Sequence, residues 1–325
     1  MAIRLVLAGA AIWAVTRELH DVNMAELTQA LGNMRPARYV LGAACTLASF
    51  LLLGVIEWMA LRHSEGTASE RVPMAAALRT GFVANALSQS VGLAVLTGAA
   101  VRVRAYSRYG LTSVDVAQTT AFVTITAMLG LLAAGAVAVV ANGAPVHVGA
   151  LSFTALPAAL GLGGIVAAYL LWSLSGKGDG VGWRRWRIPR PTPTLAVGQT
   201  TISALDWLIT GAALYAFMPQ QYGLRIGIVL GAYMVAQVVA VTSHVPAGAG
   251  VFELVVVAIL LRVEPAAPRA ALAAALVMFR VAYYLVPLCM AVVIATAGEL
   301  SRKATRTSPA YDRGMAASAE LDHAS

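Results

Sequence analysis

The stretch Ser243–Glu253, SHVPAGAGVFE, lies between two apolar runs at residues 225–242 and 250–262. A proline and several small turn-forming residues are a poor choice for the middle of a helix, because proline removes a backbone hydrogen bond and glycine favours other conformations. We therefore expect the chain to turn here. Glu253 would then lie in the first turn of the helix that follows, where a carboxylate complements the helix dipole.

The composition around this stretch is that of a membrane protein. The chain has 325 residues, of which 59% are hydrophobic and 12% charged, whereas soluble domains have about 25% charged residues. Several runs approach the roughly 20 residues that cross a bilayer, so the fold class is an all-α polytopic membrane protein. The nine apolar runs lie at residues 3–19, 37–61, 75–98, 116–141, 150–174, 195–217, 225–242, 250–262 and 271–297.

The net charge of +8 does not indicate a nucleic-acid partner, because the basic residues gather in a few loops, as the positive-inside rule expects. The cysteines and histidines are scattered, so we expect neither a metal site nor a cofactor. No P-loop or hydrolase motif is present. The polar tail, residues 299–325, is expected to be disordered.

Loop charges assign the sides of the membrane. The basic segments at 102–115, 176–190 and the tail are expected to be cytoplasmic, and the uncharged connection 141–150 external. With 3–19 as an uncleaved first span, both termini are cytoplasmic. Run 75–98 must then start and end inside, and segment 225–262 must start and end outside.

Both of these segments contain polar residues at their centres, so each is most simply a re-entrant helix–loop–helix hairpin. Ordinary short spans joined by an interfacial turn are the alternative. The hairpin reading gives about six spans plus two hairpins in two inverted repeats, a design of many secondary transporters. A single domain, 1–300, would comprise a first half, 1–174, a linker, 175–194, and a second half, 195–298.

Four ionisable side chains lie inside apolar runs: Glu57, Asp206, Glu253 and Arg280. Each costs roughly 2.5–3.5 kcal/mol at a helix centre, so such groups mark a pathway or pair with one another. Structural alternatives exist for three of them. Glu57 could be an interfacial anchor beside Trp58, Glu253 a helix cap, and Arg280 half of an ion pair that holds the two halves together.

Arg102 and Arg104 follow the first predicted hairpin directly. They could hold phosphate groups at the cytoplasmic mouth, because guanidinium groups bind phosphate in a bidentate manner. They could equally be topology signals.

Four ordered motifs carry a resemblance to a known family: NALSQSVGLAVLTGAAVRVRAYSRYGLTSVDVA, SALDWLITGAALY, SHVPAGAGVFE and RVAYYLVPL. Together they resemble the flippase half of the lysyl-phosphatidylglycerol synthase/flippase family (multiple peptide resistance factor), over about residues 1–300. The resemblance implies movement of aminoacylated phosphatidylglycerol from the inner to the outer leaflet, which gives resistance to cationic antimicrobial peptides. The family's hairpin tip commonly reads PGGxG, and here Ala247 replaces the first glycine.

The family's synthase half has no counterpart in this sequence, so we expect no lysyltransferase activity and no enzyme. A separately encoded lipid aminoacyltransferase is then a candidate partner. The resemblance carries over the charged positions Glu57, Arg102, Asp206, Glu253 and Arg280. The full predicted set for substrate binding and translocation is Glu57, Arg102, Arg104, Asp206, Ser243, Pro246, Gly248, Gly250, Glu253, Arg280 and Tyr284.

The leading hypothesis is a translocator of phospholipids in the bacterial inner membrane, with a phosphatidylglycerol-derived or aminoacylated lipid as substrate. One alternative is a scaffold that binds lipid or an aminoacyltransferase without transport. A second is a secondary transporter of small solutes. The lipid, the direction, the energy source and the oligomeric state, including a homo-oligomer, stay open from sequence.

Overall fold

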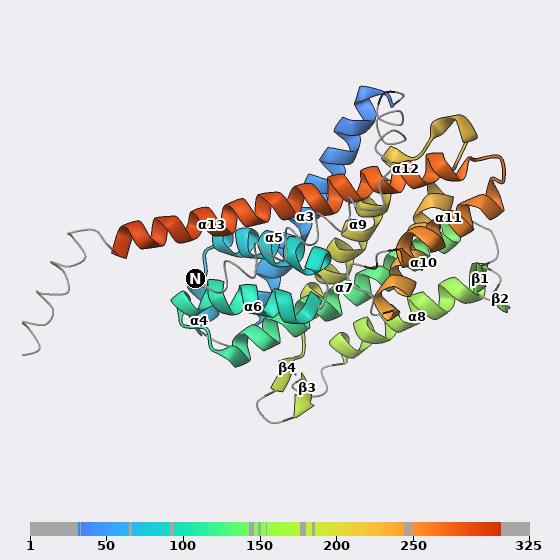
Figure 1. Ribbon diagram of the computed structural model, residues 1–325. Helices are drawn as coiled ribbons and strands as arrows, with labels where there is room; N and C mark the ends of the chain where they lie inside the picture. Colours follow the sequence, from blue (N-terminus) through green and yellow to red (C-terminus); the bar gives the residue numbers. More distant parts are fainter. Residues whose placement is uncertain are drawn as a thin grey trace, which may run out of the picture.

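The computed structural model describes residues 32, 34–64, 67–91, 94–142, 146–148, 151–153, 155–175, 180–183, 186–243, 248 and 250–306. The predicted first span at 3–19 lies outside these residues, as does the tail after 306. The chain folds into a bundle of helices (Figure 1), which confirms the predicted all-α class. Two β-hairpins in the connections, β1–β2 and β3–β4, were not predicted.

The long helices are α3 (Pro36–His63), α5 (Met74–Val91), α6 (Ala94–Tyr106), α7 (Ser113–Asn142), α8 (Ala155–Leu174), α9 (Pro193–Phe217), α10 (Ile226–Thr242), α11 (Val251–Val263), α12 (Arg269–Arg280) and α13 (Val286–Arg306). A π-helical segment, η4 (Val281–Leu285), joins α12 to α13. The shorter elements are α4 (Thr67–Glu70), η1 (Ser107–Tyr109), η2 (Gln220–Tyr222), β1 (Val146–Val148), β2 (Leu151–Phe153), β3 (Gly180–Trp183) and β4 (Trp186–Pro189). Helix α13 extends past residue 299, where the sequence predicts the polar tail to start.

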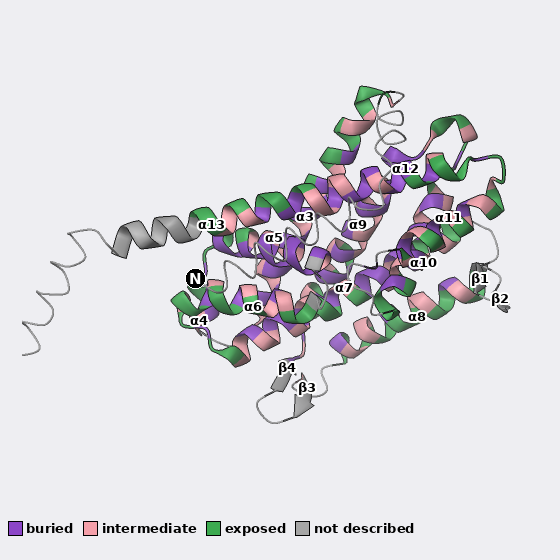
Figure 2. Cartoon of the chain, in the orientation of Figure 1, coloured by how far each residue is buried: buried purple, intermediate pink, exposed green. Residues whose placement is uncertain are grey.

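Four of the described helical segments are long and apolar enough to cross a membrane: Pro36–His63, Ser113–Ala141, Leu156–Leu174 and Arg269–Ala297. Their outward faces are apolar and exposed, as Figure 2 shows along α8, where Leu156, Leu160 and Leu171 are among the exposed large hydrophobic residues. Helix α9 is also long, with 25 residues, but polar residues interrupt it and it is not among the four. The protein is therefore a polytopic α-helical membrane protein.

Both interrupted segments are helical hairpins. Helices α5 and α6 are separated by residues 92–93 and pack against each other, and α10 and α11 do the same around residues 243–250. These helices have 13 to 18 residues, or about 20–27 Å, which is short for a hydrocarbon core of about 30 Å. The prediction that a loop begins at Arg102 is wrong, because α6 continues to Tyr106.

Helices α3 and α9 form an antiparallel pair at the centre of the bundle (Figure 1). At one end, Arg38 in the first turn of α3 donates hydrogen bonds to the carbonyls of Tyr215 (3.3 Å) and Ala216 (2.9 Å) at the end of α9. At the other end, His63 Nε2 lies 2.9 Å from the Pro189 carbonyl, just before α9 begins. The hairpin helix α5 packs on α3 and α13, and α10 packs on α9 and α7.

Helices α7 and α9 approach each other closely at Gly130. A Cβ atom added there would lie 2.1 Å from Ser203 Oγ and 2.6 Å from the Ser203 carbonyl carbon, so the backbone would have to move. We expect Gly130→Ala to lower the free energy of unfolding by about 1–3 kcal/mol, the usual cost of overpacking. Thermal unfolding in detergent measures this. Gly164→Ala on α8, where a Cβ meets open space, is the matched control, and equal unfolding temperatures for the two variants would contradict the close approach.

Candidate functional site

One face of α9 is polar although it is buried in the bundle. The residues on this face recur every three or four positions, the spacing that aligns side chains along a helix. They are Gln199, Thr200, Ser203, Asp206 and Thr210, and all are buried. A polar stripe inside an apolar bundle must find its hydrogen-bond partners on the neighbouring helices.

Asp206 is the charged member of the stripe, and it is only 5% exposed. Ser49 Oγ on α3 donates a 2.5 Å hydrogen bond to its carboxylate. The Ser49 hydroxyl also lies 2.7 Å from the Tyr283 hydroxyl, and Thr210 Oγ1 lies 3.1 Å from the same Tyr283 oxygen. Within the described ranges no cation forms an ion pair with Asp206. Ser49 is the hydroxyl that contacts the carboxylate, and Tyr283 and Thr210 hold Ser49 in turn.

Arg280 and Glu253 form an ion pair between α12 and the second hairpin. The Arg280 guanidinium donates to Glu253 Oε1, and its carbon lies 5.8 Å from the centre of the Tyr284 ring. The other carboxylate oxygen of Glu253 accepts a 2.8 Å hydrogen bond from the Gly250 amide. Glu253 therefore both caps α11, as the alternative for this residue expected, and pairs with Arg280. Arg280 does form an ion pair, but both partners lie in the predicted second half, so the pair does not join the two halves.

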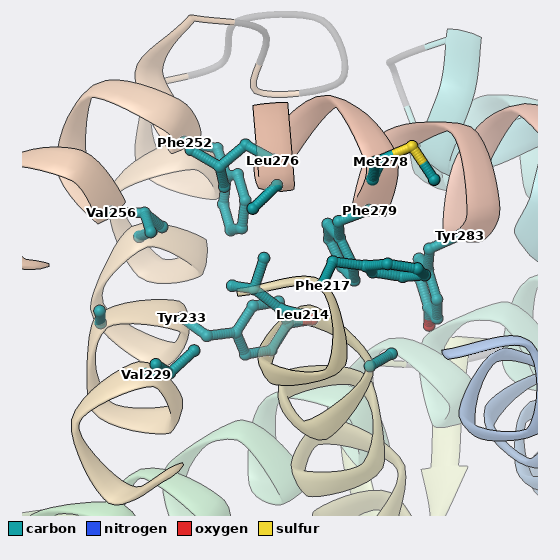
Figure 3. Close-up of a cluster of buried hydrophobic side chains, with 14 of the residues drawn as sticks. Leu214, Phe217, Val229, Tyr233, Phe252, Val256, Leu276, Met278, Phe279 and Tyr283 are labelled. Atoms are coloured by element: carbon teal, nitrogen blue, oxygen red, sulfur yellow. The ribbon is translucent and has the colours of Figure 1, made fainter. Parts of the chain in front are cut away.

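The π-helical segment η4 connects this pair to Asp206. It begins directly after Arg280 and contains Tyr283, three residues further on. Figure 3 shows Tyr283 beside Phe279, and their rings are stacked with centroids 5.4 Å apart. Phe279 in turn contacts Phe252 of α11 and Tyr233 of α10. Isolated π-helical turns occur frequently at functional sites, and this one directs Arg280 and Tyr283 to two neighbouring polar groups.

A second ion pair joins the first hairpin to α3. Arg102 on α6 donates three hydrogen bonds of 2.7–3.0 Å to the two carboxylate oxygens of Glu57. Tyr106, one turn later, donates a 2.9 Å hydrogen bond to Glu57 Oε1. Glu57 is 0% exposed, so the alternative in which it snorkels to the interface does not hold. Gly81 allows helix α5 of this hairpin to pack closely on α3, because a Cβ at Gly81 would lie 2.9 Å from Glu57 Cβ.

The predicted charged residues other than Arg104 thus form three adjacent groups: the Glu57–Arg102 pair, the Glu253–Arg280 pair, and Asp206 with its hydroxyl partners. Arg280 and Tyr283 are three residues apart on one helical segment, which puts the Glu253 pair next to the Asp206 group. Ser49 and Glu57 are eight residues apart on α3, or about 12 Å along the axis. All three groups are largely closed off by the surrounding helices in this structure.

The other predicted site residues lie around the second hairpin, except Arg104. Ser243 is exposed at the end of α10 and donates to the Ala240 carbonyl at 2.7 Å. Gly248 (φ +60°) and Gly250 (φ +80°) take a left-handed conformation that favours glycine. Pro246 lies outside the described residues, and Arg104 is exposed on α6, away from Glu57.

Sequence reasoning did not include four polar residues of these groups: Ser49, Tyr106, Thr210 and Tyr283. Their hydroxyl groups lie in apolar helices, where hydroxyl-bearing residues are common and carry no distinct signal. Tyr106 and Thr210 stand four residues after Arg102 and Asp206 respectively, so helical spacing could have indicated them. Among the described residues no group of three or more His, Cys, Asp or Glu could hold a metal ion.

The fold and these groups define a class of protein: a polytopic helical membrane protein with two helical hairpins, each tied to a neighbouring helix by an ion pair, buried at the first hairpin and partly buried at the second. The chain belongs to the family described as the lysylphosphatidylglycerol synthase TM region, whose model matches residues 1–291.

Three relatives illustrate the family. An uncharacterized protein of Synechocystis sp. is 29% identical, over 85% of this chain and 84% of that protein. The inner membrane protein YbhN of Escherichia coli is 26% identical, over 87% of this chain and 82% of its own length. A phosphatidylglycerol lysyltransferase of Staphylococcus haemolyticus is 23% identical over 90% of this chain, a match that covers only 33% of that longer protein.

The Glu57–Arg102 pair predicts an asymmetric response to substitution. Arg102→Gln leaves a buried carboxylate without its counter-ion, and we expect a loss of about 3–5 kcal/mol in the free energy of unfolding. The double variant Glu57→Gln/Arg102→Gln removes both charges and should recover much of that loss. Thermal unfolding in detergent completes the double-mutant cycle, with the exposed Arg79→Gln on α5 as control. Additive losses in the double variant would show that the two side chains are not coupled.

Proposed function

We propose that the protein translocates a phospholipid between the leaflets of the bacterial inner membrane, and that the lipid is phosphatidylglycerol or an aminoacylated form of it. The observation that carries the proposal is the pairing of buried charges at the two hairpins. Acidic and basic groups inside a membrane protein mark pathways for charged substrates. A phospholipid fits such a pathway, because its charged headgroup can enter the protein interior while its acyl tails stay in the bilayer.

Exchange of ion-pair partners provides a mechanism. A phosphodiester can replace the Glu253 carboxylate at the Arg280 guanidinium, because both anions accept two parallel hydrogen bonds. The ammonium group of an aminoacylated lipid would then meet Glu253 or Asp206, whose carboxylate accepts a hydrogen bond from Ser49. Partner exchange keeps each buried charge compensated, which lowers the cost of moving the headgroup across the core.

We also propose that the two halves form an inverted repeat. In each half a long helix precedes a hairpin, and a second long helix follows it: α3, α5–α6 and α7 in the first half, then α9, α10–α11 and α12–α13 in the second. The hairpin helix α5 contacts α3 and α13, and its counterpart α10 contacts α9 and α7. The antiparallel α3–α9 pair is the expected centre of such a repeat.

The repeat predicts which side of the membrane each hairpin enters from. Single cysteines at positions 71 and 112, which flank the first hairpin, should face the cytoplasm, and those at 221 and 264 should face outward. The background variant replaces Cys45 and Cys289 with alanine. A membrane-impermeant thiol reagent applied to intact cells should label 221 and 264, and label 71 and 112 only after permeabilisation. Labelling of one flank of a hairpin from each side would show an ordinary span and contradict re-entry.

Translocation itself can be measured in proteoliposomes with fluorescent phosphatidylglycerol and an impermeant quencher. We expect Arg280→Gln and Asp206→Asn to slow transfer at least about tenfold, the effect of losing about 1.4 kcal/mol of stabilisation along the path. Arg262→Gln, an exposed arginine on the Glu253 helix α11, should transfer lipid like the wild type. Wild-type rates in both test variants would end the assignment.

Measurements on the wild-type protein separate the two alternatives, the scaffold and the small-solute transporter. A scaffold would bind lipid or a separate lipid aminoacyltransferase and show no transfer above empty liposomes. A small-solute transporter would be stabilised against heat by soluble substrates and not by phospholipids. The name of the Staphylococcus haemolyticus relative, a phosphatidylglycerol lysyltransferase, supports the lipid and suggests that an aminoacyltransferase can act as a partner.

A further inference from the structure

A cavity of about 720 Å³ lies at one end of the bundle, away from the three polar groups described above. It is lined by the start of α3, the end of α9, the segment after α9 that includes Gln220 and Gln221, and α12 as far as Met278. Small-molecule sites commonly have volumes of about 300–1,000 Å³. Two segments that are long and apolar enough to cross a membrane, Pro36–His63 and Arg269–Ala297, begin here. Because the end of a membrane span lies near the boundary between hydrocarbon and headgroups, we place the cavity near that boundary.

One wall of the cavity is cationic. Arg35 and Arg38 line it, and none of the described lining residues is acidic. Arg38 is held in place because its Nη1 donates to the carbonyls of Tyr215 and Ala216, which leaves its Nη2 and Nε groups for another acceptor. Arg35 and Pro268, the residues before the first turns of α3 and α12, also line the cavity, and neither helix start has a side-chain cap. The backbone amides in the first turns of the two helices, apart from Pro36, which has no N–H, add positive potential at the same place.

The α12 side of the cavity is an apolar wall of small side chains, because Ala270, Ala271, Ala274 and Ala275 present one face of the helix. Phe217 and Met278 also line the cavity, as do the amide side chains of Gln220 and Gln221. An anion without an apolar part would leave this wall uncovered. The combination of fixed guanidinium groups and an apolar wall at the edge of the hydrocarbon fits an amphiphile with an anionic head.

We propose that this cavity binds an anionic phospholipid, with its phosphate at Arg35 and Arg38 and part of an acyl chain along α12. The site is separate from the Glu253–Arg280 and Asp206 groups, and it adds a headgroup-binding position to the proposed translocator. Binding at this cavity is measured at equilibrium, so the binding proposal can hold or fail independently of the transport proposal.

The experiment uses the full chain in lipid nanodiscs that contain phosphatidylglycerol with a photoactivatable group in its acyl chain. After illumination, mass spectrometry maps the labelled peptides. We expect label between Pro268 and Met278, and less label with a matched phosphatidylcholine probe, which carries no net charge. In Arg35→Gln/Arg38→Gln the phosphatidylglycerol fraction for half-saturation should rise about tenfold, as expected when charge-assisted hydrogen bonds are lost.

Three further variants guard against a folding defect and separate this site from transport. Arg35→Gln alone changes an exposed side chain and should still weaken labelling. Arg225→Gln, an exposed arginine at the start of α10, does not line the cavity and should label like the wild type. Asp206→Asn should also keep its label, which separates this site from the transport step.

Three results would overturn the proposal. Equal labelling by phosphatidylcholine would show that the cavity binds acyl chains and does not distinguish between headgroups. Displacement of the label by millimolar inorganic phosphate would show a site for a free oxyanion. Unchanged labelling in both arginine variants would show that the guanidinium groups do not contact the lipid.

Discussion

The energetic cost of placing charge inside a bilayer determines much of this architecture. An isolated ion in a low-dielectric interior is so unfavourable that it must be paired, hydrogen-bonded or neutralised. Glu57 accepts three hydrogen bonds from Arg102 and one from Tyr106. Arg280 donates a hydrogen bond to the Glu253 carboxylate, which also accepts one from a backbone amide. Each of these contacts also positions a hairpin helix, so the same interactions that compensate charge hold α6 and α11 in place.

Small and hydroxyl-bearing residues bring the central helices close enough for these contacts. The ring of Phe217 lies over Gly42 of α3, where a Cβ atom would come within 2.3 Å of it. Ser49 on α3 and Ser203 on α9 occupy similarly tight positions, and Ser49 reaches both Asp206 and Tyr283. In membranes, such close packing with interhelical hydrogen bonds replaces the hydrophobic driving force that soluble bundles use.

The sequence contained enough information to predict most of the described helices, the two breaks and the ionisable side chains that lie within apolar helices. Apolar runs, a proline–glycine turn and buried charges each have a large energetic signature that is visible without a structure. The pairing could not be predicted, because which acid meets which arginine depends on how hairpins fold back across the bundle. Arg102 illustrates this: its place after an apolar run indicated a loop, yet its contact with Glu57 belongs to a helix that extends to Tyr106. Hydroxyl groups such as that of Tyr283 were missed because only a tertiary partner distinguishes them from packing residues.

The two ion pairs differ in a way that bears on how the bundle could open. In the first pair the side chains of Glu57 and Arg102 are 0% and 5% exposed, whereas in the second Glu253 is 26% and Arg280 9% exposed. The more accessible pair therefore lies at the second hairpin. The cavity at the start of α12 extends to Met278, two residues before Arg280. A headgroup bound at Arg35 and Arg38 would lie against the α12 face of Ala271, Ala274 and Met278, whereas Arg280, two positions after Met278, projects from another side of the helix toward Glu253. In the proposed mechanism the second hairpin would move first, because its ion pair is the less costly of the two to exchange for a lipid phosphate.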